Sequence, residues 1–210
     1  MLKKENIHNI YLLLSAAIIL YGVILGLTGS GQIHLLLGMA GGSRFHFSVL
    51  KTFTYQSNLL LVGGFIAMVA LKNSRLRHYI SVSVILSTTL TGLVYNFLLV
   101  PIAGAPMFFS SFENFTTHVL VTVLALVNYF VFEGKGFLSF RHVLVGMVFP
   151  VVYWVVFVTI GERINFFPYF FMNPSAVGWV MVFVWFFILL GFFAGLGGLL
   201  LLYDRRGGRL

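Results

Sequence analysis

Apolar residues occur along this chain in six long runs, which are separated by short polar or glycine-rich segments. Each run is close to or longer than the about 20 apolar residues that a helix needs to cross a bilayer. The pattern therefore predicts an all-α membrane protein, a six-transmembrane-helix bundle. The predicted spans lie at about residues 9–28, 49–71, 79–100, 114–132, 141–160 and 176–203.

The segments between the spans are too short to hold a soluble domain, so we predict a single polytopic membrane domain over residues 1–210. The first run is longer than the roughly 7–15 apolar residues of a cleaved signal peptide, and we interpret it as a span. We expect a glycine-rich loop at residues 29–48, with Pro101 and Pro106 as breakers after the third span. Pro150 is expected to kink the fifth span.

Basic residues are distributed unequally over the connecting segments, and lysine and arginine are enriched on the cytoplasmic side of membrane proteins. With a cytoplasmic N-terminus, the non-cytoplasmic side holds only Arg44, Lys51 and Arg163. The cytoplasmic side then holds 10 of the 13 basic residues: Lys3, Lys4, Lys72, Arg75, Arg77, Lys135, Arg141, Arg205, Arg206 and Arg209. This asymmetry predicts that both termini are cytoplasmic.

Composition excludes several classes of protein. Hydrophobic residues make up 60% of the chain and charged residues 9%, against about 25% charged in soluble domains, so we do not expect a soluble globular domain, and a disordered chain is excluded. The absence of cysteine excludes disulfides, thiolate metal sites and cysteine nucleophiles. The net charge of +8 comes without a nucleic-acid-binding motif, so we expect no nucleic-acid partner.

The five acidic residues lie at the ends of the predicted spans or between them: Glu5, Glu113, Glu133, Glu162 and Asp204. A proton pump or cation antiporter usually carries a carboxylate at mid-membrane, and Mg²⁺ and Ca²⁺ sites also need carboxylates. We therefore predict no metal site and no cofactor. The oligomeric state is left open.

Two polar clusters stand near the starts of the second and fourth spans. Thr54, Ser57 and Asn58 share one helical face, and Asn114 lies one turn from His118. At about 1.5 Å per residue, Thr54 lies roughly 7 Å and His118 roughly 6 Å into their predicted spans, from the same side. A hydroxyl and an imidazole at one depth can form a nucleophile and its general base.

Structural explanations compete with the catalytic one. Serine and threonine in spans often bond to their own helix or to a neighbour, and a histidine near a span end often lies at the interface. The motifs Gly22-x-x-x-Gly26 and Gly191-x-x-x-Gly195 predict close helix packing.

The chain resembles the androgen-induced-gene family of six-span membrane proteins and its bacterial six-span relatives. Animal members of that family are threonine hydrolases of fatty acid esters of hydroxy fatty acids. The chain lacks the proline that often follows the family's histidine, and the animal members lack the Ser57-Asn58 pair, which leaves another substrate or activity open. The similar motifs are Phe53-Thr54 with Gln56-Ser57-Asn58-Leu59-Leu60, Asn114-x-x-x-His118, Tyr153-Trp154, and Gly161 with Phe167-Pro168-Tyr169-Phe170.

The resemblance implies an intramembrane hydrolase of a membrane lipid or fatty acyl ester, with Thr54 as nucleophile and His118 as base. Its bacterial members imply an integral protein of the bacterial cytoplasmic membrane. The alternative is a non-enzymatic small transporter or lipid-binding membrane protein.

The other roles in such a site have several candidates each. The group that orients His118 is expected to be Asn114, Tyr95 or Asn96. The oxyanion donors are expected among Gln56, Ser57 and Asn58, and the substrate-binding residues are expected to be Lys51, Tyr153 and Arg163.

Overall fold

The structure is a computed structural model, and it describes residues 4–28, 47–71, 75–105, 107, 109–133 and 135–207. This part of the chain is helical and contains no β-strand. Six helical segments are long and apolar enough to cross a bilayer, which confirms the predicted number of long apolar helices. They are Lys4–Leu27, Phe53–Ala70, Arg75–Ala103, Phe112–Phe132, Phe140–Ile160 and Pro174–Gly207.

Two of these segments, Arg75–Ala103 and Phe112–Phe132, change their helix type along their length. The elements in chain order are α1 (Lys4–Leu27), the 3-10 turn Phe47–Lys51, α3 (Phe53–Ala70), α4 (Arg75–Val94), the π turn Tyr95–Leu99, α5 (Val100–Ala103), α6 (Phe112–Phe115), the π turn Thr116–Leu120, α7 (Val121–Val127), the π turn Asn128–Phe132, α8 (Phe140–Ile160), the 3-10 turn Phe170–Met172 and α9 (Pro174–Gly207).

Some sequence predictions fall on residues outside the described ranges. They concern residues 29–46 of the glycine-rich loop, Pro106, and the basic residues Lys3, Arg44, Lys72 and Arg209.

Local side chains explain where two of the helices begin. Ser111 has an extended backbone, and its hydroxyl accepts a hydrogen bond from the Asn114 amide at 3.0 Å, so the fourth long helix starts at Phe112. Ser139 and His142 form a capping box at the start of α8.

Pro101 does not act as the predicted breaker, because α5 continues to Ala103 and ends at Gly104, whose φ is 66°. The π turn Tyr95–Leu99 ends two residues before Pro101 and widens the backbone where the proline ring would otherwise meet the carbonyl of Phe97. Pro150 lies inside α8.

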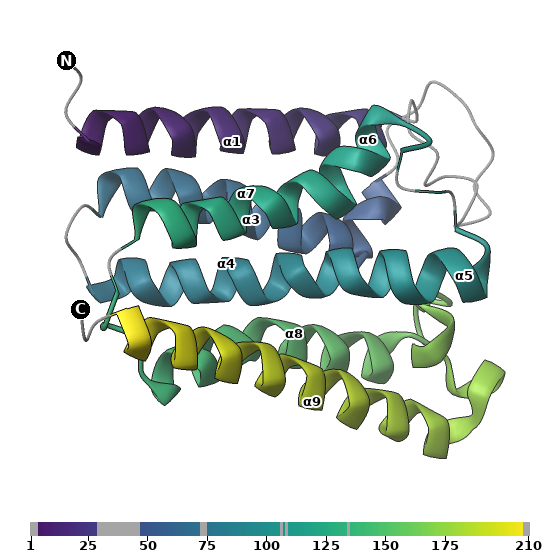
Figure 1. Cartoon of the computed structure of the whole chain (residues 1–210). Coiled ribbons are helices and arrows are strands. Elements are labelled where there is room, and N and C mark those ends of the chain that lie inside the picture. The colour runs from purple at the N-terminus through teal and green to yellow at the C-terminus, as the bar shows by residue number, and fades with distance from the viewer. Residues whose placement is uncertain are drawn as a thin grey trace. The chain divides into compact units, whose positions relative to one another are not determined.

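The described residues fall into two compact units, residues 1–134 and 135–210. In the first unit, α1 contacts α3 and the π turn Thr116–Leu120, while α4 contacts α3 and α7. These four helical segments pack together (Figure 1). Glycines lie at the closest approaches. A Cβ on Gly26 would overlap the Tyr55 hydroxyl, and a Cβ on Gly22 would overlap the Thr116 hydroxyl. The packing role predicted for this glycine pair is confirmed.

A polar network closes one end of the first unit. The Arg77 guanidinium donates to Glu133 Oε1 at 3.1 Å, to the carbonyl of Met68 at 2.9 Å and to His8 Nδ1 at 2.9 Å. His8 Nε2 lies 2.8 Å from Asn128 Oδ1. Because the arginine can only donate, Nδ1 of His8 is unprotonated and accepts its hydrogen bond, and Nε2 of His8 donates to Asn128. The network joins α1, α4 and the π turn Asn128–Phe132.

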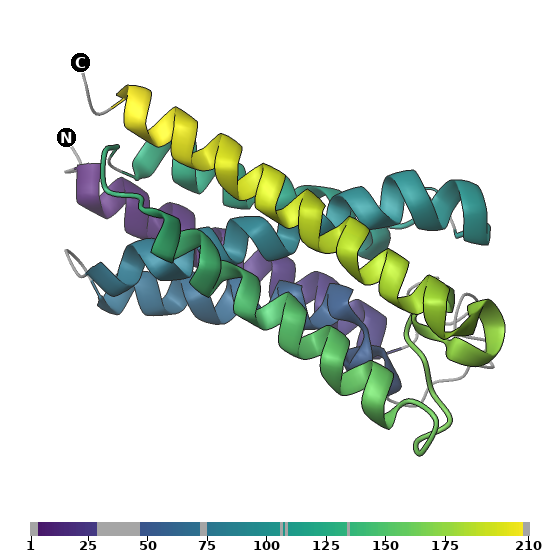
Figure 2. The same ribbon diagram turned by 90° about the horizontal axis from the view of Figure 1, so that it is seen from below.

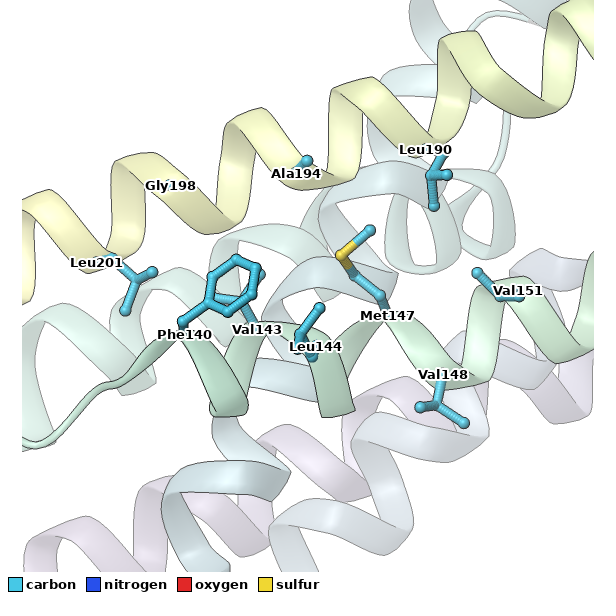
Figure 3. A pocket seen from close by; sticks show the side chains of 10 residues that line it. All are labelled: Phe140, Val143, Leu144, Met147, Val148, Val151, Leu190, Ala194, Gly198 and Leu201. Atoms are coloured by element: carbon cyan, nitrogen blue, oxygen red, sulfur yellow. The ribbon is translucent and has the colours of Figure 1, made fainter.

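In the second unit, α8 and α9 lie side by side (Figure 2). A Cβ on Gly197 would overlap Val143, and the Asp204 carboxylate accepts a hydrogen bond from the Leu138 amide at 2.8 Å. Gly178 has a φ of 78° and interrupts the regular helix near the start of α9. An apolar groove runs between the two helices, with Met147 and Leu190 among its lining residues (Figure 3).

The packing role predicted for Gly191 and Gly195 is not found. No heavy atom of the described residues, beyond those the helix itself supplies, lies within 4 Å of the place where a Cβ would stand on either glycine.

The glycine contacts lead to a stability prediction. Gly26→Ala should destabilise the protein by about 1–3 kcal/mol, because the added methyl group overlaps the fully buried Tyr55 side chain. The matched control is Gly63→Ala in α3, where the added Cβ meets no atom of the described residues within 4 Å. The control should be neutral or should gain up to about 1 kcal/mol from helix propensity. Denaturant unfolding in detergent measures both, and equal stability of the two variants would contradict the packing.

Candidate active site

Thr54 and His118 approach each other inside the first unit. Thr54 lies in the first turn of α3, and His118 lies in the π turn Thr116–Leu120. Their side chains are 5% and 1% exposed, and Thr54 Oγ1 lies 3.4 Å from His118 Nε2. This confirms the predicted approach of the two side chains. The distance is long for a hydrogen bond, as is common for a nucleophile and base without substrate.

The second ring nitrogen of His118 faces two acceptors. Nδ1 lies 3.1 Å from the main-chain carbonyl of Asn114 and 3.0 Å from Thr117 Oγ1. The Thr117 hydroxyl donates its proton to the carbonyl of Glu113 at 2.8 Å, so its oxygen accepts from the imidazole. Nδ1 therefore carries the ring proton, and Nε2 turns its lone pair toward the Thr54 hydroxyl. This is the tautomer that a general base for Thr54 requires.

The groups that orient His118 differ in part from those predicted. Asn114 acts through its main-chain carbonyl, while its side-chain Nδ2 donates to the carbonyl of Met107 at 3.0 Å. Tyr95 stacks on the imidazole, with ring centroids 3.5 Å apart and an angle of 25° between the planes. Asn96 is not brought to His118, because its side-chain amide donates to the carbonyl of Gly92 in its own helix at 2.7 Å. Thr117 is not among the predicted site residues, although it directly precedes the histidine in the sequence.

The three predicted oxyanion donors are engaged elsewhere. Gln56 Nε2 donates to the carbonyl of Leu50 at 3.1 Å. The Ser57 hydroxyl lies 2.9 Å from the carbonyl of Thr54 and 2.7 Å from the hydroxyl of Thr91 in α4. These side chains satisfy main-chain carbonyls and join helices, which is what buried polar groups in an apolar interior must do.

Asn58, the third predicted oxyanion donor, is fully buried. Its Nδ2 lies 2.6 Å from the carbonyl of Thr54 and 3.0 Å from the carbonyl of Thr117. Both protons of the amide are therefore used on main-chain carbonyls, and neither is available to an oxyanion.

A buried acid and phenol lie close to this site. Glu113 is 1% exposed, and the Tyr55 hydroxyl donates to its Oε1 at 2.5 Å. The sequence predicts that Glu113 lies outside the fourth span, because the apolar run begins at Asn114. The structure corrects this, since the helix cap at Ser111 includes Glu113 in the first helical turn. A serine two residues before the glutamate was the signal for this earlier start.

The predicted substrate-binding residues occupy both units. Lys51 is exposed at the end of the 3-10 turn before α3. Tyr153 and Arg163 belong to the second unit, where Tyr153 is 6% exposed and packs on Phe157, and Arg163 is exposed after α8. Their role in substrate binding stays a prediction. Within the described ranges, no group of three or more histidine and acidic side chains could hold a metal ion.

Comparison of the chain with family models, with curated proteins and with solved structures gave no match. A function therefore has to be inferred from the side chains of this chain.

The Tyr55–Glu113 contact leads to a second stability prediction. Tyr55→Phe should destabilise the protein by about 1–3 kcal/mol, because it removes the hydrogen bond to a buried carboxyl group. Combined with Glu113→Gln, the loss should differ from the sum of the single losses by about 0.5 kcal/mol or more, as expected for residues in contact. Chemical denaturation of the parent, the two single variants and the double variant measures this cycle.

The matched control for this cycle is Tyr11→Phe, since the Tyr11 hydroxyl donates to the carbonyl of Leu124 at 2.6 Å, away from Glu113. Tyr11→Phe and Glu113→Gln should be additive. Additivity of Tyr55→Phe with Glu113→Gln would show that the phenol and the carboxyl group do not interact in solution.

Proposed function

We propose that this protein is an integral membrane hydrolase of fatty acyl esters, with Thr54 as nucleophile and His118 as general base. The observation that carries the proposal is the imidazole arrangement: two acceptors hold the proton on Nδ1, and Nε2 faces the Thr54 hydroxyl at 3.4 Å. The resemblance to the six-span threonine hydrolases supports the same pair. The apolar character of the six long helices supports a lipid substrate.

The proposed reaction has two steps. His118 Nε2 takes the proton of the Thr54 hydroxyl while Oγ1 attacks the ester carbonyl. The tetrahedral intermediate collapses to an acyl group on Thr54, and the leaving alcohol receives the proton from the imidazole. In the second step, His118 takes a proton from a water molecule while the water oxygen attacks the acyl group. The fatty acid leaves, and Thr54 recovers its hydroxyl proton from the imidazole. The carbonyl of Asn114 and the hydroxyl of Thr117 stabilise the imidazolium of each step through Nδ1–H.

A second function is supported by the groove of the second unit. Its lining is apolar on both α8 and α9, as suits an acyl chain that is held but not cleaved (Figure 3). The engagement of Gln56, Ser57 and Asn58 with main-chain carbonyls also favours a non-enzymatic role, because an ester hydrolase needs oxyanion donors. The alternative is therefore a lipid-binding or small transport protein.

The hydrolase proposal predicts a specific pattern of lost activity. Thr54→Ala and His118→Ala should each lower turnover of a fluorogenic long-chain acyl ester by on the order of a thousandfold or more. Because nucleophile and base act as one unit, the double variant should be no worse than either single variant. Thr54→Ser should retain part of the activity, since it keeps the hydroxyl.

The matched control is Thr88→Ala, which removes another fully buried threonine hydroxyl, bonded within α4 to the carbonyl of Val84. It should keep the parental turnover. Equal turnover of Thr54→Ala and the parent would refute the hydrolase. If the parent protein binds a fatty acyl ester but does not hydrolyse it, the lipid-binding alternative is favoured.

We further propose that both termini are cytoplasmic, on the strength of the 10 to 3 distribution of basic residues. The chain has no cysteine, so single replacements report position directly. Phe109→Cys, at a side chain that is 72% exposed, should react with a membrane-impermeant thiol reagent added to intact cells. Arg75→Cys should react only in inside-out vesicles. The reverse pattern would overturn the orientation.

A further inference from the structure

One buried amide group touches the main chain beside both members of the proposed pair. The Nδ2 atom of Asn58 donates to the carbonyl of Thr54 and to the carbonyl of Thr117, the residue next to His118. Asn58 itself is on α3, one turn after Thr54, so the second of these bonds crosses to the fourth long helix.

The carbonyl of Thr117 needs a donor because of the local helix type. In a regular α-helix, the amide of Val121 would bond to the carbonyl four residues before it, which is that of Thr117. In the π turn Thr116–Leu120 the Val121 amide bonds to the carbonyl of Thr116 instead. Asn58 supplies the missing donor at 3.0 Å. The π turn therefore leaves the Thr117 carbonyl without its α-helical donor, and the Asn58 amide takes the place of that donor.

The orientation of the Asn58 amide follows from its partners. Both neighbours are carbonyl oxygens, which only accept, so the NH₂ group must face them. The other end, Oδ1, is buried and has no hydrogen-bond partner in the described part of the chain. Burial of such an oxygen costs free energy, and the two donated bonds, one of 2.6 Å, offset that cost.

We propose that Asn58 is a positioning residue for the hydrolase: its single amide sets the distance between the Thr54 hydroxyl and the His118 imidazole by bonding the main chain beside each. The proposal rests on the proposed function. Asn58 touches neither the ester nor the reacting atoms, and acts by holding α3 and the π turn in register.

The test compares replacements at two buried asparagines, Asn58 and Asn128. Asn58→Asp keeps the shape and removes the two donors, and Asn58→Ala removes them without placing a new oxygen against two carbonyls. The matched control is Asn128→Asp, at another buried asparagine in a π turn, whose Oδ1 accepts from His8 at the other end of the unit. The measurements are kcat and KM for a long-chain acyl ester, and nitrogen NMR of isotope-labelled histidine rings with the His118 resonances assigned by His118→Gln.

Both Asn58 variants should lower kcat by about ten- to hundredfold with KM unchanged, as expected for a residue that orients catalytic groups. They should also shift the ring resonances of His118, whereas Asn128→Asp should change neither kcat nor those resonances. If Asn58→Asp does not fold, Asn58→Ala carries the test by the same measurements.

The outcomes separate this proposal from the proposed function. An active parent whose Asn58 variants keep kcat, or whose His118 resonances stay in place, overturns the positioning role and leaves the hydrolase intact. An inactive parent in which Asn58→Ala shifts the His118 resonances overturns the hydrolase but supports the register held by Asn58. An inactive parent with unmoved resonances overturns both.

Discussion

The main-chain hydrogen bonds of the helices are the constraint on which the rest of this structure depends. In apolar surroundings a carbonyl that loses its helical partner must find a donor inside the protein. The described residues of the first unit contain three π turns, and each shifts the hydrogen-bond register of its helix by one residue. At the π turn Thr116–Leu120 the displaced carbonyl belongs to Thr117, and a side chain of another helix satisfies it. A local irregularity thereby produces a specific contact between helices.

The π turn Thr116–Leu120 also needs space, and glycines on two neighbouring helices provide it. A Cβ on Gly22 of α1 would overlap the Thr116 hydroxyl, and a Cβ on Gly92 of α4 would lie 2.8 Å from the carbonyl oxygen of His118. The wider backbone fits between α1 and α4 because both present glycine there. One packing arrangement therefore brings α1 and α4 close to the fourth long helix, accommodates its π turn and positions the imidazole of His118.

The candidate site shows how far residue spacing carries a functional prediction. Thr54 and His118 were expected to meet because they lie at matching depths in two spans that start from the same side, and their side chains do approach. The partners of the imidazole were harder to predict. The predicted orienting groups were Asn114, Tyr95 and Asn96. In the structure Tyr95 stacks on the ring, while Nδ1 faces the main-chain carbonyl of Asn114 and the hydroxyl of Thr117, which was not predicted.

The sequence by itself determined the number of long helices and their approximate bounds, because a continuous apolar run of this length has one stable form in lipid and the rise per residue then sets the depth of each polar group. The tertiary structure alone decided the roles of the polar side chains. Asn58 became a donor to two carbonyls, Asn96 a partner of its own helix, and Glu113 a buried partner of Tyr55. These roles depend on which main-chain groups the neighbouring helices leave without a partner. That depends on π turns and glycine contacts, which are set by packing between segments far apart in the chain.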